Sequence, residues 1–396
     1  MIDQLRAFRA HKQGLLSPLT GTPEEILTQI GWCRTVGATS PYLALMARAG
    51  LTRSTIDQAL ADCRIHELPS ARGCAYLLPK SDFALGLACA EDPSAPIAPS
   101  SPERQLGITA EEIEALMEAV LITLESGPRD PQQLRDELGD KVRRFGDEGK
   151  KRGITTDLPG ALGRLQNKGK IRRIPVNGRI DNERYTYTVW PDNPLQDFTF
   201  SREETFAQLA RRYESWLGPI TLAEFQWFSG FSARAAKASF TLAGITDQGS
   251  DLWAQPETWA KFQAFRAPAE KPIHLLGSID PYFLHTKNLR VSIRAEHQDH
   301  WQKLPSALNA KDSLADLATH AIIEGGELVG LWHYDPESKE VLFTHWASEP
   351  TGVRKAVDAM QAAIEKDLGD VRVYSLDSTK SRQAVLQALR EQMKSQ

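Results

Sequence analysis

The spacing of apolar residues changes partway through the segment 157–191, DLPGALGRLQNKGKIRRIPVNGRIDNERYTYTVWP. In its first part, leucine recurs at helical spacing, at Leu158, Leu162 and Leu165. Two later runs, 171–175 and 185–190, have the β-branched and aromatic composition of strands. Asn177-Gly178 between them is a good pair for a tight turn. The segment therefore predicts a helix followed by a two-stranded ribbon, which is the pattern of a winged helix.

The same order of elements occurs before and after this segment. The first copy has predicted helices at 2–14, 23–30, 42–48 and 51–63, a short strand-like or irregular segment at 32–36 and ribbon strands at 65–68 and 74–78. The second copy begins with predicted helices at 109–124 and 131–138. The third has predicted helices at 201–217, 221–228 and 232–243 and a reduced ribbon at 245–256. This repetition predicts three tandem winged helices.

Local signals mark where several of these elements begin and end. Thr22-Pro23-Glu24-Glu25 is a helix start, because the threonine can accept from backbone amides and the acids suit the positive helix end. Each copy closes on a strand followed by a proline, at Pro79, Pro191 and Pro256. The segment 141–152 is too polar and too rich in glycine to lie in a core.

From Ile273 onward the pattern becomes rich in strands. Strands are predicted at 274–282, 321–323, 328–334, 341–344 and 371–374, and a helix at 352–367. Gly325-Gly326 and the segment 335–338 are predicted hairpin turns. We therefore expect a separate β-rich C-terminal domain that also contains helices.

These elements predict an α+β fold of four domains. The segment 90–104 carries four prolines and three serines, which indicates a linker or a long surface loop. The predicted domains are winged helices at 1–89, 105–200 and 201–270, and the β-rich domain at 271–396.

The composition is that of an ordinary globular protein of 396 residues, with 41% hydrophobic and 25% charged residues. No apolar run approaches the roughly 20 residues of a membrane span, and the N-terminus lacks a signal-peptide core. We therefore expect a cytoplasmic protein, associated with the nucleoid when it binds DNA. Four cysteines without a C-x-x-C pair, Cys33, Cys63, Cys74 and Cys89, are interpreted as free thiols. We expect no metal and no cofactor.

Charge is concentrated in one part of the chain. Between Lys141 and Arg173 there are eleven lysines and arginines against three acids, although the whole chain has a net charge of −4. A local excess of this kind is typical of a surface that faces phosphates. The alternative is that the charges only solvate a helix face. The predicted DNA contacts are Lys168, Lys170, Arg172, Arg173, Arg143, Arg144, Lys150, Lys151, Arg152, Arg34 and Arg72.

Three further segments carry a resemblance to a known family. They are SPYLALMAR at 40–48, leading to Arg72-Gly73-Cys74 and to 79–83; GPITLAEF at 218–225, with Trp227, Ser229 and Gly230; and LLGSIDPYFL at 275–284, followed by 328–330. Over nearly its full length the chain resembles the crosslink-repair DNA glycosylases of the YcaQ and AlkZ family. The resemblance implies three winged helices and a C-terminal barrel around a concave DNA site. It also implies hydrolysis of the N-glycosidic bond of alkylated purines, including crosslinked ones.

The chain departs from that family at its catalytic signature, which is glutamine, an apolar residue, and then glutamine or aspartate. The signature precedes the helix that starts here at Ser40. One alignment places it at Gln29-Ile30-Gly31, and another places it near Cys33-Arg34-Thr35. Neither supplies both polar side chains. The sequence therefore leaves two hypotheses open, a DNA glycosylase and a non-catalytic DNA-binding protein that senses lesions or regulates.

Departure of an N7-alkylated purine needs little acid catalysis because the base is already cationic. The enzyme has to stabilise an oxocarbenium-like sugar and position a water, which a carboxylate or an amide can do. The candidate residues are Gln29, Thr35, Glu67, Asp82 and Asp280. Each also has a structural interpretation, respectively as a helix-end residue, a strand residue, an ion-pair partner, a helix cap and a turn former. The expected partner is damaged double-stranded DNA, bound by a monomer, with RNA or a protein as an alternative.

Overall fold

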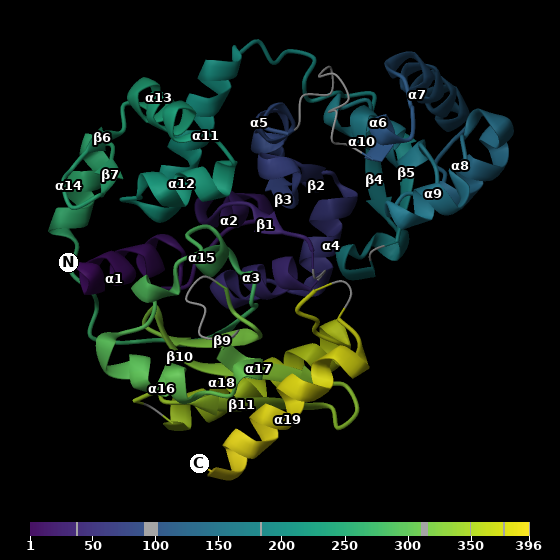
Figure 1. The fold of residues 1–396 in the computed structure, drawn as a ribbon. Coiled ribbons are helices and arrows are strands. Elements are labelled where there is room, and N and C mark those ends of the chain that lie inside the picture. The colour runs from purple at the N-terminus through teal and green to yellow at the C-terminus, as the bar shows by residue number, and fades with distance from the viewer. Residues whose placement is uncertain are drawn as a thin grey trace. The chain divides into compact units, whose positions relative to one another are not determined.

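The computed structural model describes residues 1–36, 39–90, 102–182, 184–309, 316–348, 350–374 and 377–395 (Figure 1). Most of the predicted linker 90–104 lies outside these ranges. The chain forms two compact units. Unit 1 comprises Met1–His66, Tyr76–Ser81 and Ser201–Gln396, and unit 2 comprises Glu67–Ala75 and Asp82–Phe200. Unit 1 is therefore assembled from stretches that are far apart in sequence.

The N-terminal part of unit 1 contains the helices that the sequence predicts. They are α1 (Ile2–Lys12), α2 (Pro23–Ile30), α3 (Ser40–Ala49) and α4 (Arg53–Ala61). The predicted start of α2 is confirmed, since the Thr22 hydroxyl accepts from the Glu25 amide and the Glu25 carboxylate accepts from the Thr22 amide at 2.8 Å. Between α2 and α3 lies the short strand β1 (Cys33–Arg34), antiparallel to β3 (Ala75–Pro79) in the sheet β1-β3-β2.

A second set of helices in unit 1 follows the same order. It comprises α11 (Arg202–Leu217), α12 (Leu222–Ser229), α13 (Ala233–Ala243), the strands β6 (Thr246–Asp247) and β7 (Trp253–Ala254), and α14 (Pro256–Ala264). Ser201, Thr221 and Ser232 each cap the helix that follows, by accepting from a backbone amide in its first turn. The helices at 201–217, 221–228 and 232–243 are thereby confirmed as elements, because local capping signals fix their starts.

The C-terminal part of unit 1 is built on a four-stranded antiparallel sheet in the order β11-β10-β9-β8. Its strands are β8 (Ile273–Leu276), β9 (His320–Glu324), β10 (Glu327–Asp335) and β11 (Glu340–His345). The accompanying helices are α15 (Pro281–Leu284), α16 (Gln298–Lys303), α17 (Ser306–Asn309), α18 (Pro350–Ala363) and α19 (Thr379–Ser395). Gly325 and Gly326 form the predicted β9–β10 turn with φ values of 58° and 88°, which glycine adopts without strain.

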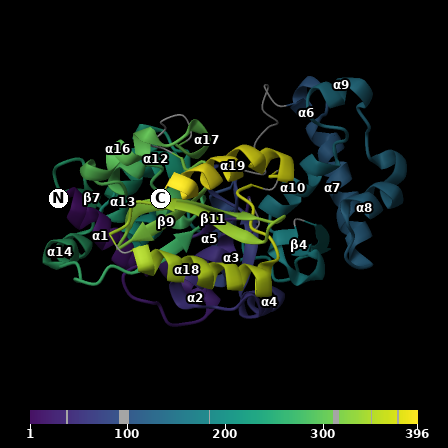
Figure 2. The ribbon, with the colours of Figure 1, turned by 90° about the horizontal axis from the view of Figure 1, so that it is seen from below.

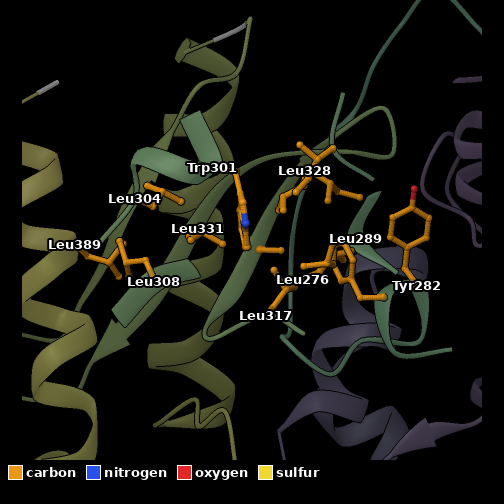
Figure 3. Close-up of a cluster of buried hydrophobic side chains, with 14 of the residues drawn as sticks. Leu276, Tyr282, Leu289, Trp301, Leu304, Leu308, Leu317, Leu328, Leu331 and Leu389 are labelled. Carbon is orange, nitrogen blue, oxygen red and sulfur yellow. The ribbon is translucent and has the colours of Figure 1, made fainter. Parts of the chain in front are cut away.

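The described strands of this part form an open sheet, so the barrel that the family resemblance implied is not found among them. Helices cover both faces instead, since α18 and α19 lie on opposite sides of the sheet (Figure 2). Every residue of β10 is buried, as this arrangement requires. On one face, Trp301, Leu304, Leu308 and Leu389 pack against residues of the strands (Figure 3).

One predicted strand is wrong and another is too long. Residues 371–374 form no strand, because carboxylates take their backbone amides: Asp370 accepts from Val371 and Asp377 accepts from Val373. The predicted strand at 274–282 ends at Leu276, since Asp280 caps α15 by accepting from the Tyr282 amide at 2.9 Å. The helix α19, whose apolar positions join the core of the sheet, was not predicted.

Unit 2 contains the whole helix-and-ribbon segment 157–191. Its elements are α5 (Phe83–Ala88), α6 (Pro102–Gln105), α7 (Ala110–Glu125), α8 (Pro131–Leu138), α9 (Gly146–Lys151), α10 (Leu158–Asn167), β4 (Ile171–Pro175) and β5 (Tyr185–Val189). The strand β2 (Ile65–Pro69) crosses from unit 1 into unit 2.

The ribbon β4–β5 of unit 2 is antiparallel, from Ile171 opposite Val189 to Pro175 opposite Tyr185. Asn177 and Gly178 both adopt positive φ, as the pair predicts, but they lie within a longer connection than a tight hairpin. Among the described residues of the whole chain, no helix is long and apolar enough to cross a membrane, and no group of three or more metal-binding side chains occurs.

Candidate functional site

The strand β1 in unit 1 carries the second alignment of the family signature. The Cys33 side chain is fully buried and Thr35, which follows the strand, is 5% exposed, whereas Arg34 is half-buried. The Arg34 guanidinium lies over the Tyr76 ring on the neighbouring strand, with Cζ 5.3 Å from the ring centroid. Burial raises the pKa of the Cys33 thiol, so it is not a nucleophile at neutral pH. Arg34 is therefore the side chain of this strand that solvent reaches.

Gly31 occupies a position where no side chain fits. Its φ is 97°, and a Cβ there would lie 2.5 Å from His285 Cε1 and 2.7 Å from Trp216 Cδ2. The alignment Gln29-Ile30-Gly31 therefore has no room for a polar group at its third place. Gln29 itself is exposed at the end of α2, where its Nε2 donates to the Lys12 carbonyl at 3.3 Å. Of the two alignments, only 33–35 places side chains on and beside the strand.

Four aromatic side chains form a buried cluster next to β1, called here the aromatic cluster. Trp32, Tyr76, Trp216 and Phe228 are all buried, with ring centroids 5.3 Å apart for Trp32 and Trp216, and 6.0 Å apart for Tyr76 and Phe228. His285 stacks on Trp216 with centroids 5.2 Å apart. This packing holds the backbone before and along β1 in a fixed place.

His285 connects this aromatic cluster to the backbone by hydrogen bonds. Its Nε2 lies 2.9 Å from the Trp32 carbonyl oxygen, and its own carbonyl accepts from the Tyr213 hydroxyl at 2.6 Å. Burial lowers the pKa of His285 to about 4. The neutral ring therefore carries its proton on Nε2 and donates it to Trp32.

Two buried ion pairs connect the distant stretches of unit 1. Arg48 on α3 binds both carboxylate oxygens of Asp280, at 2.6 and 2.9 Å, and Arg9 on α1 binds both oxygens of Glu224, at 2.8 and 2.9 Å. Since Asp280 also accepts from the Tyr282 amide, its oxygens are fully engaged within the protein. These contacts describe a structural role for the predicted catalytic candidate Asp280.

Gln13 connects Arg48 to the end of α2 through hydrogen bonds. Its main-chain oxygen accepts from Arg48 Nε at 2.9 Å, and its side-chain Nε2 donates to the carbonyls of Ile30 and Trp216, at 2.8 and 3.1 Å. The end of α2, just before β1, is thereby fixed to α11 and α3.

In unit 2, two residues predicted for different roles form a pair. Glu67, a catalytic candidate, is 4% exposed and binds Arg173, a predicted DNA contact. The Tyr185 hydroxyl donates to the same carboxylate at 3.0 Å, and the Arg173 guanidinium lies over the Tyr185 ring. Asp82, also in unit 2, is fully buried directly before α5. Glu67 therefore stabilises the ribbon, in keeping with its alternative interpretation as an ion-pair partner.

Several of the other predicted DNA contacts in unit 2 also have partners. Arg143 binds Glu112, Lys150 binds Asp147, Lys151 binds Glu148, Lys168 binds Glu114, and Arg152 binds the side chain of Gln105. These pairs are largely exposed, so they are weak and can exchange for phosphate contacts. Arg72, exposed between β2 and β3, has a left-handed φ of 59°.

Three predicted contacts in unit 2 have no side-chain hydrogen bond or ion pair to another described residue. These are Arg144, Lys170 and Arg172. On β4, side chains alternate between faces, so Arg172 points away from the face on which Ile171 enters the core. Lys170, just before the strand, shares the outer face with Arg172. This pair forms the free cationic edge of the ribbon.

Sequence reasoning missed the residues that hold β1 in place, which are Gly31, His285, Gln13 and the partners of the buried ion pairs. The weak signals were a charged residue at the end of an apolar helix, Arg48, and a glycine directly after α2. Nothing in the sequence indicates that His285 and Gly31 meet.

Comparisons with known proteins agree with one another. The model of a family described as DNA glycosylase AlkZ-like matches residues 28–372. The structure of Streptomyces sahachiroi DNA glycosylase AlkZ is similar, with a TM-score of 0.68 at 20% sequence identity, covering 94% of this chain and 98% of that one. At this identity the structural likeness shows the fold alone. No curated protein matches the chain.

Replacing Gly31 with alanine is expected to destabilise the protein. The new methyl group meets buried aromatic rings, which costs about 1–3 kcal/mol, and the backbone conformation, with φ of 97° and ψ of 178°, adds about 1–3 kcal/mol. The control is Gly50→Ala, with a φ of 59° and nothing within 4 Å, which carries only the backbone cost of a left-handed residue, about 1–2 kcal/mol. Urea unfolding followed by circular dichroism measures both. Equal losses of stability in the two variants would contradict the close packing at Gly31.

The depressed pKa of His285 predicts a stability that depends on pH. Because the unfolded state binds the proton more readily, the contribution of His285 is complete above pH 6.5 and is lost as the pH falls toward 4. The full loss amounts to roughly 3 kcal/mol. His285→Gln should flatten the dependence of the unfolding free energy on pH in this window, while His11→Gln, at an exposed position, should not. Identical pH profiles for His285→Gln and the wild type would disprove the assignment.

Proposed function

Because the chain belongs to the AlkZ-like DNA glycosylase family, we propose that it binds damaged double-stranded DNA and removes alkylated purines, including crosslinked ones, by hydrolysing the N-glycosidic bond. The observation that carries the DNA-binding part is the free cationic edge of the ribbon, Lys170 and Arg172, together with Arg144 in the same unit. Unpaired cations are available for phosphates without breaking internal contacts.

The proposal includes the domain arrangement that the sequence predicts. Three helix-and-ribbon segments, 1–89, 105–200 and 201–270, act as winged helices, and 271–396 acts as the C-terminal domain. The capped helices that precede each ribbon support this interpretation. Phosphate contacts of this kind give affinity without sequence choice, which suits a protein that has to find lesions in any sequence.

The chemical step is proposed to take place at β1. Among residues 33–35, Thr35 bears the one side-chain oxygen, and its hydroxyl is suited to orient the attacking water. The Arg34 guanidinium cannot stabilise the cationic sugar, because like charges repel, so its role is to hold a phosphate beside the lesion. The departing alkylated purine carries its own positive charge and needs no acid.

A second candidate function is lesion binding without excision. It is favoured by the same strand, because Cys33, Arg34 and Thr35 include no carboxylate and no amide side chain. In that case the protein marks or covers the lesion.

An excision assay separates the two functions. The purified protein is incubated with duplexes that contain N7-methylguanine or a crosslinked purine, and abasic sites are scored as strand breaks after alkali. The glycosylase predicts breaks above the blank and a loss of about 100-fold in rate for Thr35→Ala. Retained binding of the lesion duplex without any breaks would establish the non-catalytic function.

The free cationic edge predicts a change in the salt dependence of DNA binding. Lys170→Ala combined with Arg172→Ala should reduce the slope of log K against log salt by about 1.8, roughly 0.9 for each phosphate that is no longer neutralised. Lys380→Ala combined with Lys394→Ala, two exposed lysines of α19, is the charge-matched control and should leave the slope unchanged. Fluorescence anisotropy over a salt series provides the measurement. A slope equal to that of the wild type would remove this edge from the interface.

A further inference from the structure

Lys287 in unit 1 is a cation that lies over the ring of Trp227. It lies two residues after His285, whose ring binds the Trp32 carbonyl next to the strand. Its ammonium nitrogen lies 5.0 Å from the ring centroid of Trp227 on α12. The residue after Trp227, Phe228, packs against both Trp32 and Tyr76, with centroids 6.1 and 6.0 Å apart. Each member of the Lys287–Trp227 pair is therefore close in sequence to a residue that packs in the aromatic cluster next to β1.

The backbone amide of Lys287 donates to the Phe283 carbonyl, but its ammonium group makes no hydrogen bond to another described residue. Its one ion pair within the described part of the chain, with Asp316, spans 3.4 Å. The Asp316 side chain is 53% exposed, so this pair is weak. The Lys287 side chain itself is 32% exposed. The ammonium is thus accessible, partly desolvated and able to donate to a ligand.

The backbone of Lys287 is strained. Its φ is 47°, in the left-handed region that costs a residue with a Cβ roughly 1–2 kcal/mol. Asparagine and glycine are the usual residues there. The cation–π contact holds the side chain in one position, which lowers the entropy lost when a ligand binds.

We propose that Lys287 binds a DNA phosphate next to the nucleotide at β1, and that Trp227 is the residue that positions it. The partner chemistry is a phosphodiester, because a compact ammonium with available donors suits a point contact to a phosphate oxygen. Arg34, which lies on Tyr76 in the same way, provides a second such cation on the strand itself. The inference rests on the proposed DNA-binding function and adds to it a contact in unit 1, separate from the ribbon of unit 2.

The experiment uses Lys287→Asn, which removes the charge and fits the left-handed backbone. The same change at Lys339, where φ is 59° in the turn between β10 and β11, is the matched control. Both variants should fold at least as stably as the wild type, as thermal unfolding measures. Only Lys287→Asn should lower the slope of log K against log salt for duplex DNA, by about 0.9.

Variants of Trp227 test the positioning role. Trp227→Leu keeps the lysine charge but removes the ring, so it should weaken binding of the lesion duplex with the salt slope retained, and Trp227→Phe should restore most of the affinity. A slope for Lys287→Asn equal to that of Lys339→Asn, in a protein that binds DNA, overturns this inference alone. A wild-type protein that does not bind DNA overturns the proposed function together with it.

Discussion

The structure of unit 1 depends on two buried ion pairs that connect stretches of chain more than 200 residues apart. Arg48 pairs with Asp280, and Arg9 pairs with Glu224, each through two hydrogen bonds. Inside a protein an unpaired charge is costly, so loss of either partner of such a pair destabilises by about 3–5 kcal/mol. The paired geometry is therefore the one in which the N-terminal helices and the C-terminal part of unit 1 fit together, and α3 is fixed relative to α15.

The position of β1 follows from that fixed arrangement. Gln13 accepts from Arg48 and donates to the Ile30 carbonyl at the end of α2. The His285 ring binds the Trp32 carbonyl just before the strand. Gly31 allows the chain to come this close to the rings of Trp216 and His285. A strand packed against rigid neighbours keeps its exposed groups in place, as the proposed recognition of a damaged nucleotide requires. In this chain the group presented there is a guanidinium, in contrast with the amides and carboxylates of the family signature.

The distribution of charge separates structural from available cations. Arg173 stabilises the ribbon through Glu67 and Tyr185, whereas Lys170 and Arg172 lie at the other face of the same strand, without side-chain partners in the described part of the chain. Alternation along a strand thus divides one basic run into an internal and an external set. In unit 1, Arg34 and Lys287 each lie over an aromatic ring, a geometry that orients a cation. The phosphate contacts that we propose therefore come from both units.

The sequence alone determined the elements whose signals are local. The capping residues before α2, α11 and α12, the helical leucines of α10 and the glycine pair between β9 and β10 each depend on neighbours only a few positions away, so they could be predicted. The excess of basic residues between Lys141 and Arg173 and the departure from the catalytic signature could also be read from the sequence. Tertiary structure alone decided that the C-terminal sheet is open, that Asp280 and Glu67 are occupied by arginines, and that Gly31 lies against His285. The reason is physical. Each of these outcomes depends on which residue, distant in sequence, forms the hydrogen bond, the ion pair or the packing contact, and the local spacing of residues does not identify that partner.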